Sequence, residues 1–437
     1  MTRKKTFLLT LCVLCVLCGK KTVFAADIRI LTLDQALALA MDRNRDIDKA
    51  REYGRYVQGR YVEERAAALP QLSLNGSVIL ARDDSQGAQL GMAPRQYSRS
   101  VDLALSQPLF TWGKVGAAIR AAQVGLKTAD QQLRLSRQAA HRDVCAAFYD
   151  ILLARELQTL SGENLAQKQR LLNEARRKYE AGVATDYDVL AAEVAVENAR
   201  PECIRSINVV RAARERLRFL LALGEQEVDA SGVLPAALEQ PKPYREALAV
   251  AALKRPELAD ARLRIGIYSE LITIASAENK PRLDLKGGAG WHWLDLGGGG
   301  QHLRADGAAW NAGIYLTFPF FDGLRTNGKV VQATSELRTR QIEEARLLDA
   351  IALEVRTSND AVRESLEIAQ ALGGTVKQAE KLLQMAEKGY EYGVKIRLEV
   401  DDAQLNLLQA RSNLARAQRN YHVARVEYDW AMGVAGE

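Results

Sequence analysis

Residues 176–200, RRKYEAGVATDYDVLAAEVAVENAR, return 211 positions later as residues 387–411, EKGYEYGVKIRLEVDDAQLNLLQAR. Both stretches place a Tyr-Glu-x-Gly-Val pattern between two long helix-forming segments. Glycine adopts the left-handed conformation at low cost, so a glycine here is typical of a turn that joins two helices. Each stretch therefore predicts the tip of a helical hairpin, and the pair predicts a tandem duplication.

The offset of 211 residues holds along the chain. Further anchors in the same register are Pro70-x-Leu72-x-Leu74 with Pro281-x-Leu283-x-Leu285, and Pro108-x-Phe110 with Pro319-x-Phe321. We predict a first repeat over 27–224, a linker over 225–240, a second repeat over 241–433 and a short C-terminal end over 434–437.

The N-terminus reads as a signal peptide over residues 1–26. Arg3, Lys4 and Lys5 precede an apolar run over 6–18 that is too short to span a bilayer, and cleavage is expected after Ala25 or Ala26. Lipidation at Cys18 is the alternative. Removal of the leader takes away five basic residues and no acidic ones, so the net charge of +6 falls to 55 − 54 = +1. The charge therefore gives no reason to expect nucleic-acid binding.

Two runs in each repeat alternate apolar and polar residues, as strands of a transmembrane barrel do. In the first repeat Leu72 and Leu74 alternate with Ser73 and Asn75. A soluble two-stranded hairpin is the alternative. The strand ends carry aromatic residues that suit a membrane-interface belt; they are Phe110, Trp112, Phe318, Phe320 and Phe321.

A helical pattern runs from Gly113 to Glu180 without proline, and at 1.5 Å per residue it extends about 100 Å. Four strands per chain cannot close a barrel, and open sheet edges are not tolerated in lipid. Two chains would supply eight strands, whose interior would be filled by side chains, and three chains would supply twelve, enough for a pore. The expected fold is mainly α with a membrane β-barrel part, in which duplicated helical hairpins pack as coiled coils and the sheets of several chains close the barrel.

A partial phosphate-binding motif occurs once, at Gly323 and Gly328-Lys329. Val330 stands where the motif needs Ser or Thr, and the equivalent stretch of the first repeat lacks the motif, so we do not expect nucleotide binding. We find no catalytic motif and expect no enzyme activity and no cofactor. The histidines lack metal-ligand spacing, although His292 and His302 flank a glycine-rich loop, and Cys145 and Cys203 are expected to be buried rather than disulfide-bonded.

The chain resembles the TolC family of outer membrane efflux proteins over nearly all of its mature length. The residues that carry the resemblance are the duplication, ALPQLSLNG and NKPRLDLKG before the strands, SQPLF and TFPFF after them, and the two tip stretches. The resemblance implies a homotrimer whose sheets complete a twelve-stranded barrel in the outer membrane and whose helical hairpins form a coiled-coil tunnel that extends into the periplasm. It also implies a periplasmic adaptor and an inner membrane pump or ABC exporter as partners. A non-pore periplasmic adaptor or scaffold is the alternative function, and the cargo stays open.

The resemblance also implies a periplasmic gate at the tips. Matched from the tip glycines, the expected gate residues are Asp186, Asp188, Tyr390, Lys395, Arg397, Glu399, Asp401 and Asp402, and the expected adaptor-docking residues are Gly182, Val183, Gly393 and Val394. We expect Asp188 to pair with Lys395, and the acids after Gly393 to line the constriction. Two departures from the family pattern are Lys395, which replaces an arginine, and Pro201, which is expected to kink or break the return helix.

Overall fold

The structure is a computed structural model that describes residues 28–82, 95–298 and 301–436. The predicted signal peptide, with its cleavage site and Cys18, lies outside these residues. The chain divides into two compact units. Unit 1 comprises the chain up to Arg45 together with Ala139–Lys242 and Ser358–Trp430, and unit 2 comprises Asp46–Gln138, Pro243–Thr357 and the chain from Ala431.

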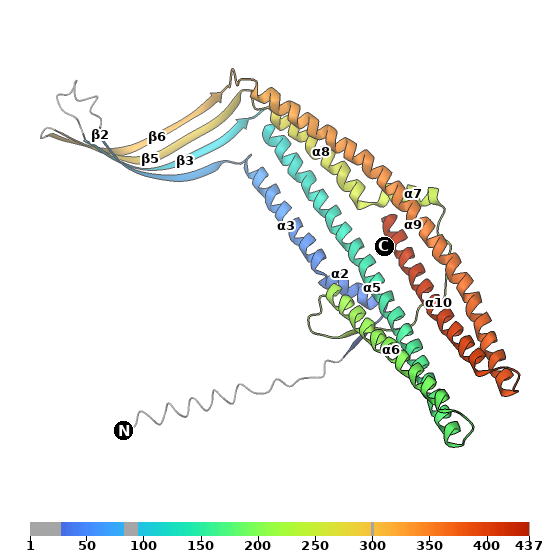
Figure 1. Cartoon of the computed structure of the whole chain (residues 1–437). Coiled ribbons are helices and arrows are strands. Elements are labelled where there is room, and N and C mark those ends of the chain that lie inside the picture. Colours follow the sequence, from blue (N-terminus) through green and yellow to red (C-terminus); the bar gives the residue numbers. More distant parts are fainter. Residues whose placement is uncertain (1–27, 83–94, 299–300, 437) are drawn as a thin grey trace, which may run out of the picture. The chain divides into compact units, whose positions relative to one another are not determined.

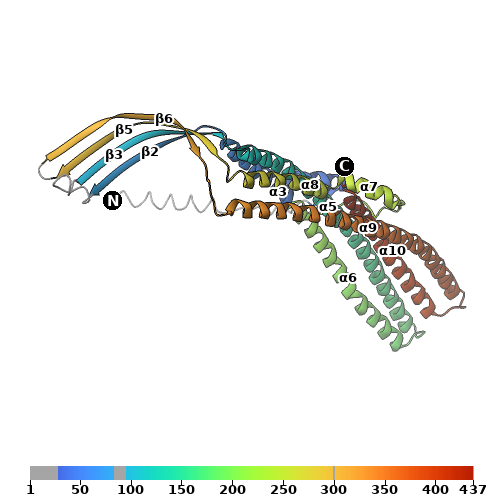
Figure 2. The same cartoon turned by 90° about the horizontal axis from the view of Figure 1, so that it is seen from above.

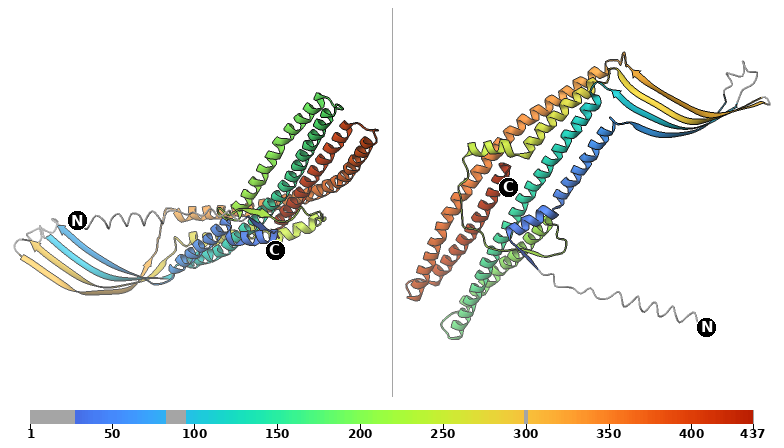
Figure 3. Two further views of the ribbon diagram at one scale, coloured as in Figure 1. Left: turned by 90° about the horizontal axis from the view of Figure 1, so that it is seen from below. Right: turned by 180° about the vertical axis from the view of Figure 1, so that it is seen from behind.

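The predicted helical hairpins are present in both repeats (Figure 1). Helix α5 (Lys114–Glu180) and α9 (Arg325–Glu391) each contain 67 residues, and the return helices α6 (Asp186–Leu220) and α10 (Arg397–Ala431) each contain 35. All four boundaries of one hairpin lie 211 residues from those of the other. Figure 3 shows the two helices of each hairpin running side by side. Pro201 lies inside the continuous helix α6, so the predicted alternative of a break is wrong, and a kink at this proline stays a prediction.

The helical segment before each sheet is divided into two helices. It forms α2 (Leu33–Arg43) and α3 (Arg45–Ala66) in one repeat, and α7 (Tyr244–Lys254) and α8 (Pro256–Ser276) in the other. The breaks fall at the equivalent residues Asn44 and Arg255, which are both buried and extended. The Asn44 side chain donates to the carbonyl of Leu220 at 2.9 Å, and Arg255 donates to that of Ala431 at 3.1 Å. Each break thereby satisfies a carbonyl at the end of a return helix.

Four antiparallel strands form one sheet in unit 2, in the order β2 (Gln71–Arg82), β3 (Arg95–Phe110), β5 (Arg282–Gly298) and β6 (Gln301–Thr317) (Figure 2). The register aligns Leu74 with Leu103 and Asn75 with Asp102, so the apolar and polar faces continue from strand to strand. Leu74 is 73% exposed in this single chain. In the described residues β2 and β6 each have a partner on one side only, which leaves two open edges.

The predicted linker over 225–240 contains a strand. Residues Val228–Ala230 (β4) pair in parallel with Arg29–Leu31 (β1), and both strands pack on the ends of the first hairpin in unit 1. Three-residue strands carry too few residues for an alternation to be recognised. The fully buried side chains of this core include Leu31, Ile151, Leu217, Leu221 and Val228. Cys145 lies in the same region and is buried, whereas Cys203 is half-buried, and both are free thiols.

The junction between the last strand and the long helix explains the isolated glycine motif. Gly323 and Leu324 both have positive φ, as do the equivalent Trp112 and Gly113, so each repeat turns through two left-handed residues. The Asp322 carboxylate accepts the backbone N–H of Thr326 at 3.0 Å. This acid occupies the helix N-terminus where a phosphate would bind, which supports the prediction that the motif is structural.

Candidate functional site

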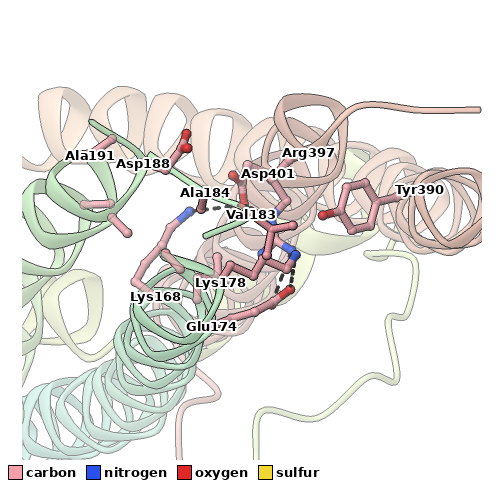
Figure 4. A pocket seen from close by; sticks show the side chains of 14 residues that line it. Lys168, Glu174, Lys178, Val183, Ala184, Asp188, Ala191, Tyr390, Arg397 and Asp401 are labelled. Carbon is pink, nitrogen blue, oxygen red and sulfur yellow. Dashed lines mark ion pairs between the residues drawn. The ribbon is translucent and has the colours of Figure 1, made fainter. Parts of the chain in front are cut away.

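A cavity of about 410 Å³ lies within unit 1 between the tips of the two hairpins (Figure 4). Helices α5 and α6 contribute most of its wall, and the second hairpin contributes Tyr390, Arg397 and Asp401. Its remaining polar lining residues are Lys168, Glu174, Lys178 and Asp188. The cavity therefore gathers acidic and basic groups from segments that lie more than 200 residues apart in the sequence.

At the tips, Arg397 and Asp401 each make an ion pair with the first hairpin; nearer the base, Arg419 of α10 pairs with Asp150 of α5 at 2.7 Å. Arg397 lies 3.9 Å from the Glu174 carboxylate and 3.7 Å from that of Asp401. Asp401 also lies 3.8 Å from the Lys168 ammonium. The Arg397 guanidinium stands 5.6 Å from the centre of the Tyr390 ring, within cation–π range. These contacts form a connected network that links helix α5 to helix α10.

Glu174 and Lys178 anchor this network on helix α5. The Lys178 ammonium lies 2.8 Å from the Glu174 carboxylate. This hydrogen bond, helped by the nearby Arg397 charge, lowers the pKa of Glu174, and the same bond raises the pKa of Lys178. The nearby Tyr390 side chain of the second hairpin also raises the pKa of Lys178. Both charged forms are therefore favoured at neutral pH, and the ion pairs persist there.

At the first tip a capping box starts helix α6. The Thr185 hydroxyl accepts from the Asp188 N–H at 3.3 Å, and the Asp188 carboxylate accepts from the Thr185 N–H at 2.8 Å. The Thr185 donors lower the pKa of Asp188. Asp186 accepts from the N–H of Tyr187. Both acids are thus engaged in starting helix α6.

The second tip has no hydroxyl cap, because Ile396 stands where the first tip has Thr185. The Glu399 carboxylate accepts the Ile396 N–H at 3.1 Å, and its other oxygen lies 2.6 Å from the Lys395 ammonium. This Lys395 contact lowers the pKa of Glu399. Within one chain the expected pair Asp188–Lys395 is therefore not formed, since each residue bonds inside its own hairpin. Asp402 is exposed.

The tip glycines form the predicted turns between the helices. Gly182 and Gly393 have φ of 73° and 72°, which places both in the left-handed region. The next residues, Val183 and Val394, are 76% and 82% exposed. Each valine N–H bonds back to a carbonyl five residues earlier, which is the closing bond of a helix C-terminus. Each tip therefore presents a rigid turn with an exposed apolar side chain.

The expected interface aromatics lie where the strands end. Phe320 and Phe321 are 89% and 81% exposed, and Phe110, Trp112 and Phe318 are roughly half exposed. Edge-on contacts join Phe110 to Trp112 and Phe318 to Phe320. Exposed aromatic rings at the end of an apolar strand face are consistent with a membrane-interface belt. Among the described helices, none is long and apolar enough to cross a bilayer.

Sequence reasoning missed Lys168, Glu174 and Lys178. They precede the first tip glycine on helix α5, so a search outward from the loop toward the return helix passes over them. The available signal is the Glu174–Lys178 spacing of four residues, which favours an ion pair on one helix face. No three His, Cys, Asp or Glu side chains cluster as metal ligands in the part of the chain that the structure describes.

Comparison with known proteins gives the family of this chain. The family model described as outer membrane efflux protein matches residues 36–223 and 247–434, two segments that are themselves 211 residues apart. The chain belongs to the outer membrane efflux protein family. It is a channel-tunnel component of the outer membrane that extends into the periplasm and serves as the exit duct of an efflux system.

Individual relatives agree with this assignment. The outer membrane protein TolC of Escherichia coli is 23% identical over 385 residues, covering 86% of this chain and 76% of TolC. The toluene efflux pump outer membrane protein TtgC of Pseudomonas putida is 25% identical over 415 residues, covering 92% and 82%. The fold matches the crystal structure of the Campylobacter jejuni CmeC outer membrane channel with a TM-score of 0.80 at 17% identity, covering 92% and 86%.

Proposed function

We propose that three copies of this chain form the duct, and that their sheets close into one twelve-stranded barrel. The four-stranded sheet with open edges at β2 and β6 carries this proposal. A sheet edge in lipid would leave backbone N–H and C=O groups without partners, at a cost of several kcal/mol for each group. Pairing of β6 with β2 of the next copy satisfies both edges and places the apolar strand face toward lipid.

We propose further that the network around Arg397 holds the tips closed. It supersedes Asp188–Lys395 as the within-chain link, and pairing of those two residues between neighbouring copies stays a prediction. A partly exposed ion pair contributes about 0.2–1 kcal/mol, so three copies acting together contribute about 0.6–3 kcal/mol, which shifts an open–closed equilibrium roughly threefold to more than a hundredfold. Glu399, Asp401 and Asp402 of three copies would surround the narrowest point and favour cations.

Channels of this family work with periplasmic adaptors and inner membrane pumps. We propose that this chain receives its cargo from such a pump or from an ABC exporter, through an adaptor that contacts the tips. The exposed Val183 and Val394 beside the rigid glycine turns support this contact, because exposed apolar side chains on a preformed turn lose little entropy on binding.

The oligomeric state tests the proposal most simply. Native mass spectrometry of the mature protein in neutral detergent is expected to give a trimer, and the same sample is expected to form pores in planar bilayers. Substitution of Leu74, on the apolar face, by Lys should reduce membrane insertion, whereas Asn75→Lys on the polar face should not. A monodisperse soluble monomer, or recovery with the inner membrane, would favour the adaptor or scaffold instead.

A further inference from the structure

A second cavity, of about 790 Å³, lies in unit 2 where the strands meet the long helices. Its strand-derived lining residues are Gln71, Ser106, Pro108, Arg282 and Thr317. Gln71, Ser106, Arg282 and Thr317 alternate with leucines of their own strands, so these four lie on the polar face of the sheet. In the proposed trimer that face looks into the duct, and the cavity is therefore part of the inner wall.

Basic side chains dominate the lining of this cavity. Lys114, Lys280, Arg282, Arg325 and Lys329 line it, against the acids Glu64 and Glu278. Glu278 lies 2.6 Å from Lys329 and 3.7 Å from Lys114, so one carboxylate serves two ammonium groups.

The remaining cations are less fully compensated. Arg282 pairs with Asp284 at 2.8 Å. In the described part of the chain neither Lys280 nor Arg325 makes an ion pair, although the Arg325 charge is near enough to lower the pKa of Glu278 and of Asp322. Lys280 stands 5.4 Å from the ring of Trp112. The wall of the cavity therefore carries an excess of positive charge.

An aromatic groove of about 340 Å³ continues from this cavity. The two share Glu64, Ala118 and Ile274 as lining residues, so they open onto the same side of the helices. Small residues of α5 form the floor of the groove, namely Ala118, Ala121, Ala122 and Gly125.

The walls of the groove are tyrosines. Tyr53 and Tyr56 of α3 are stacked with their centres 6.2 Å apart, and Tyr268 stands on α8. Arg60 and Arg264 also line the groove; Arg264 pairs with Asp260 at 2.7 Å, whereas Arg60 makes no ion pair among the described residues. A flat ring placed here would meet aromatic faces and a small-residue floor.

We propose that this combined surface, formed by the basic cavity and the tyrosine groove, binds small aromatic organic anions in the duct wall. The inference rests on the proposed trimer, which turns the polar sheet face inward. The ring of the solute would lie along the tyrosines, and its carboxylate or sulfonate would reach the unpaired cations Arg60, Arg325 and Lys280. A lipid headgroup is the less suitable occupant, because the lining strand residues lie on the face opposite the exposed leucines.

Isothermal titration calorimetry with 1-naphthoate and the detergent-solubilised trimer tests this proposal. The Arg60→Gln/Lys280→Gln variant is expected to bind 1-naphthoate about tenfold more weakly, and Tyr56→Leu several-fold more weakly. Arg55→Gln is the matched control, because Arg55 lies on α3, pairs with Glu52 and does not line the surface. It should bind as the wild type does. The single variant Lys280→Met, at an exposed site, reports on the cavity if the double variant folds poorly.

Two further ligands test whether both the charge and the aromatic ring of 1-naphthoate contribute to its affinity. 1-Naphthylmethanol, which lacks the charge, and cyclohexanecarboxylate, which lacks the aromatic ring, should each bind at least several-fold more weakly than 1-naphthoate. Inorganic phosphate binding as tightly as 1-naphthoate would overturn the proposal and indicate a simple anion or headgroup site. Absence of 1-naphthoate binding to a trimer that still conducts would overturn this inference alone. A monomer without pores would overturn the proposed duct as well.

Discussion

The two ends of the duplicated hairpins differ in how much the repeats have kept in common. At the base, the equivalent residues Asn44 and Arg255 make the same bond to equivalent carbonyls of the return helices. At the tips, the equivalent residues have opposite chemistry. Asp186 in the first repeat corresponds to Arg397 in the second, and Thr185 corresponds to Ile396.

The residues that cross between the tips are those at which the copies diverge. Glu174 corresponds to Met385 and Lys168 to Ala379, so only the first copy carries the charges that Arg397 and Asp401 meet. Identical tips would place like charges opposite one another, which is unfavourable. The comparison indicates that the bonds made in both repeats build the scaffold, whereas charges present in one repeat only build the contact between the hairpin tips.

The largest effect is expected on stability, from a substitution at the base of the second hairpin. Gly433 corresponds to Ala222, and both have positive φ, but a Cβ on Gly433 would lie 2.8 Å from the backbone nitrogen of Arg255. Gly433→Ala should therefore lower the free energy of unfolding by about 2–3 kcal/mol. Thermal dissociation of the trimer, followed by gel mobility, measures this. Ala222→Gly is the control and should change the midpoint little; equal shifts for both variants would remove the distinction between the repeats.

The acids of the second tip should set ion selectivity. Removal of Glu399, Asp401 and Asp402 by alanine substitution is expected to lower the cation-over-anion permeability ratio several-fold, because in the proposed trimer three copies of each acid would surround the constriction. Reversal potentials in asymmetric salt measure the ratio. Alanine substitution of Glu197 and Glu202, which lie further along α6 and pair within it, is the control. A ratio unchanged in the triple variant would place these acids away from the conduction path.

The contact between the tips, and with it the single-channel conductance, should depend on pH. The pKa of Glu174 is lowered from its ordinary 4.5, chiefly by the Lys178 hydrogen bond. The contribution of Glu174 is therefore complete above pH 4.5 and is lost as pH falls through the lowered pKa. Single-channel conductance should stay constant from neutral pH down to that value and rise below it. A rise already near pH 6 would indicate control by a histidine.

The smallest effect is expected from exchanging the N-cap residues of the two return helices. Thr185→Ile should speed amide exchange at residues 185–188 roughly threefold to tenfold, and Ile396→Thr should slow it to a similar degree at residues 396–399, since a hydroxyl N-cap holds the first turn. Hydrogen–deuterium exchange resolves both tips in one sample. Opposite changes are expected from the two variants; changes of the same sign would show that the capping hydroxyl does not distinguish the tips.

The sequence predicts the features that repeat or alternate. Both hairpins, their glycine turns and all four strands follow from a shared register and from regular periodicity. The breaks at Asn44 and Arg255 and the pairing of β1 with β4 do not follow, because they depend on contacts between residues about 180 to 200 positions apart. The partners of Arg397 were missed for the same reason. The expected pair of Asp188 with Lys395 does not form within the chain, because each side chain already bonds inside its own hairpin.

The conductance of the Arg397→Gln trimer in planar bilayers tests the central claim most directly. Loss of Arg397 removes the contacts with Glu174 and Tyr390 in every copy of the proposed trimer, so single-channel conductance should rise several-fold over the wild type. Arg176→Gln is the matched control, since Arg176 pairs with Glu193 inside the first hairpin and should conduct as the wild type does. Equal conductance of the wild type and both variants would contradict closure through contacts between the hairpins.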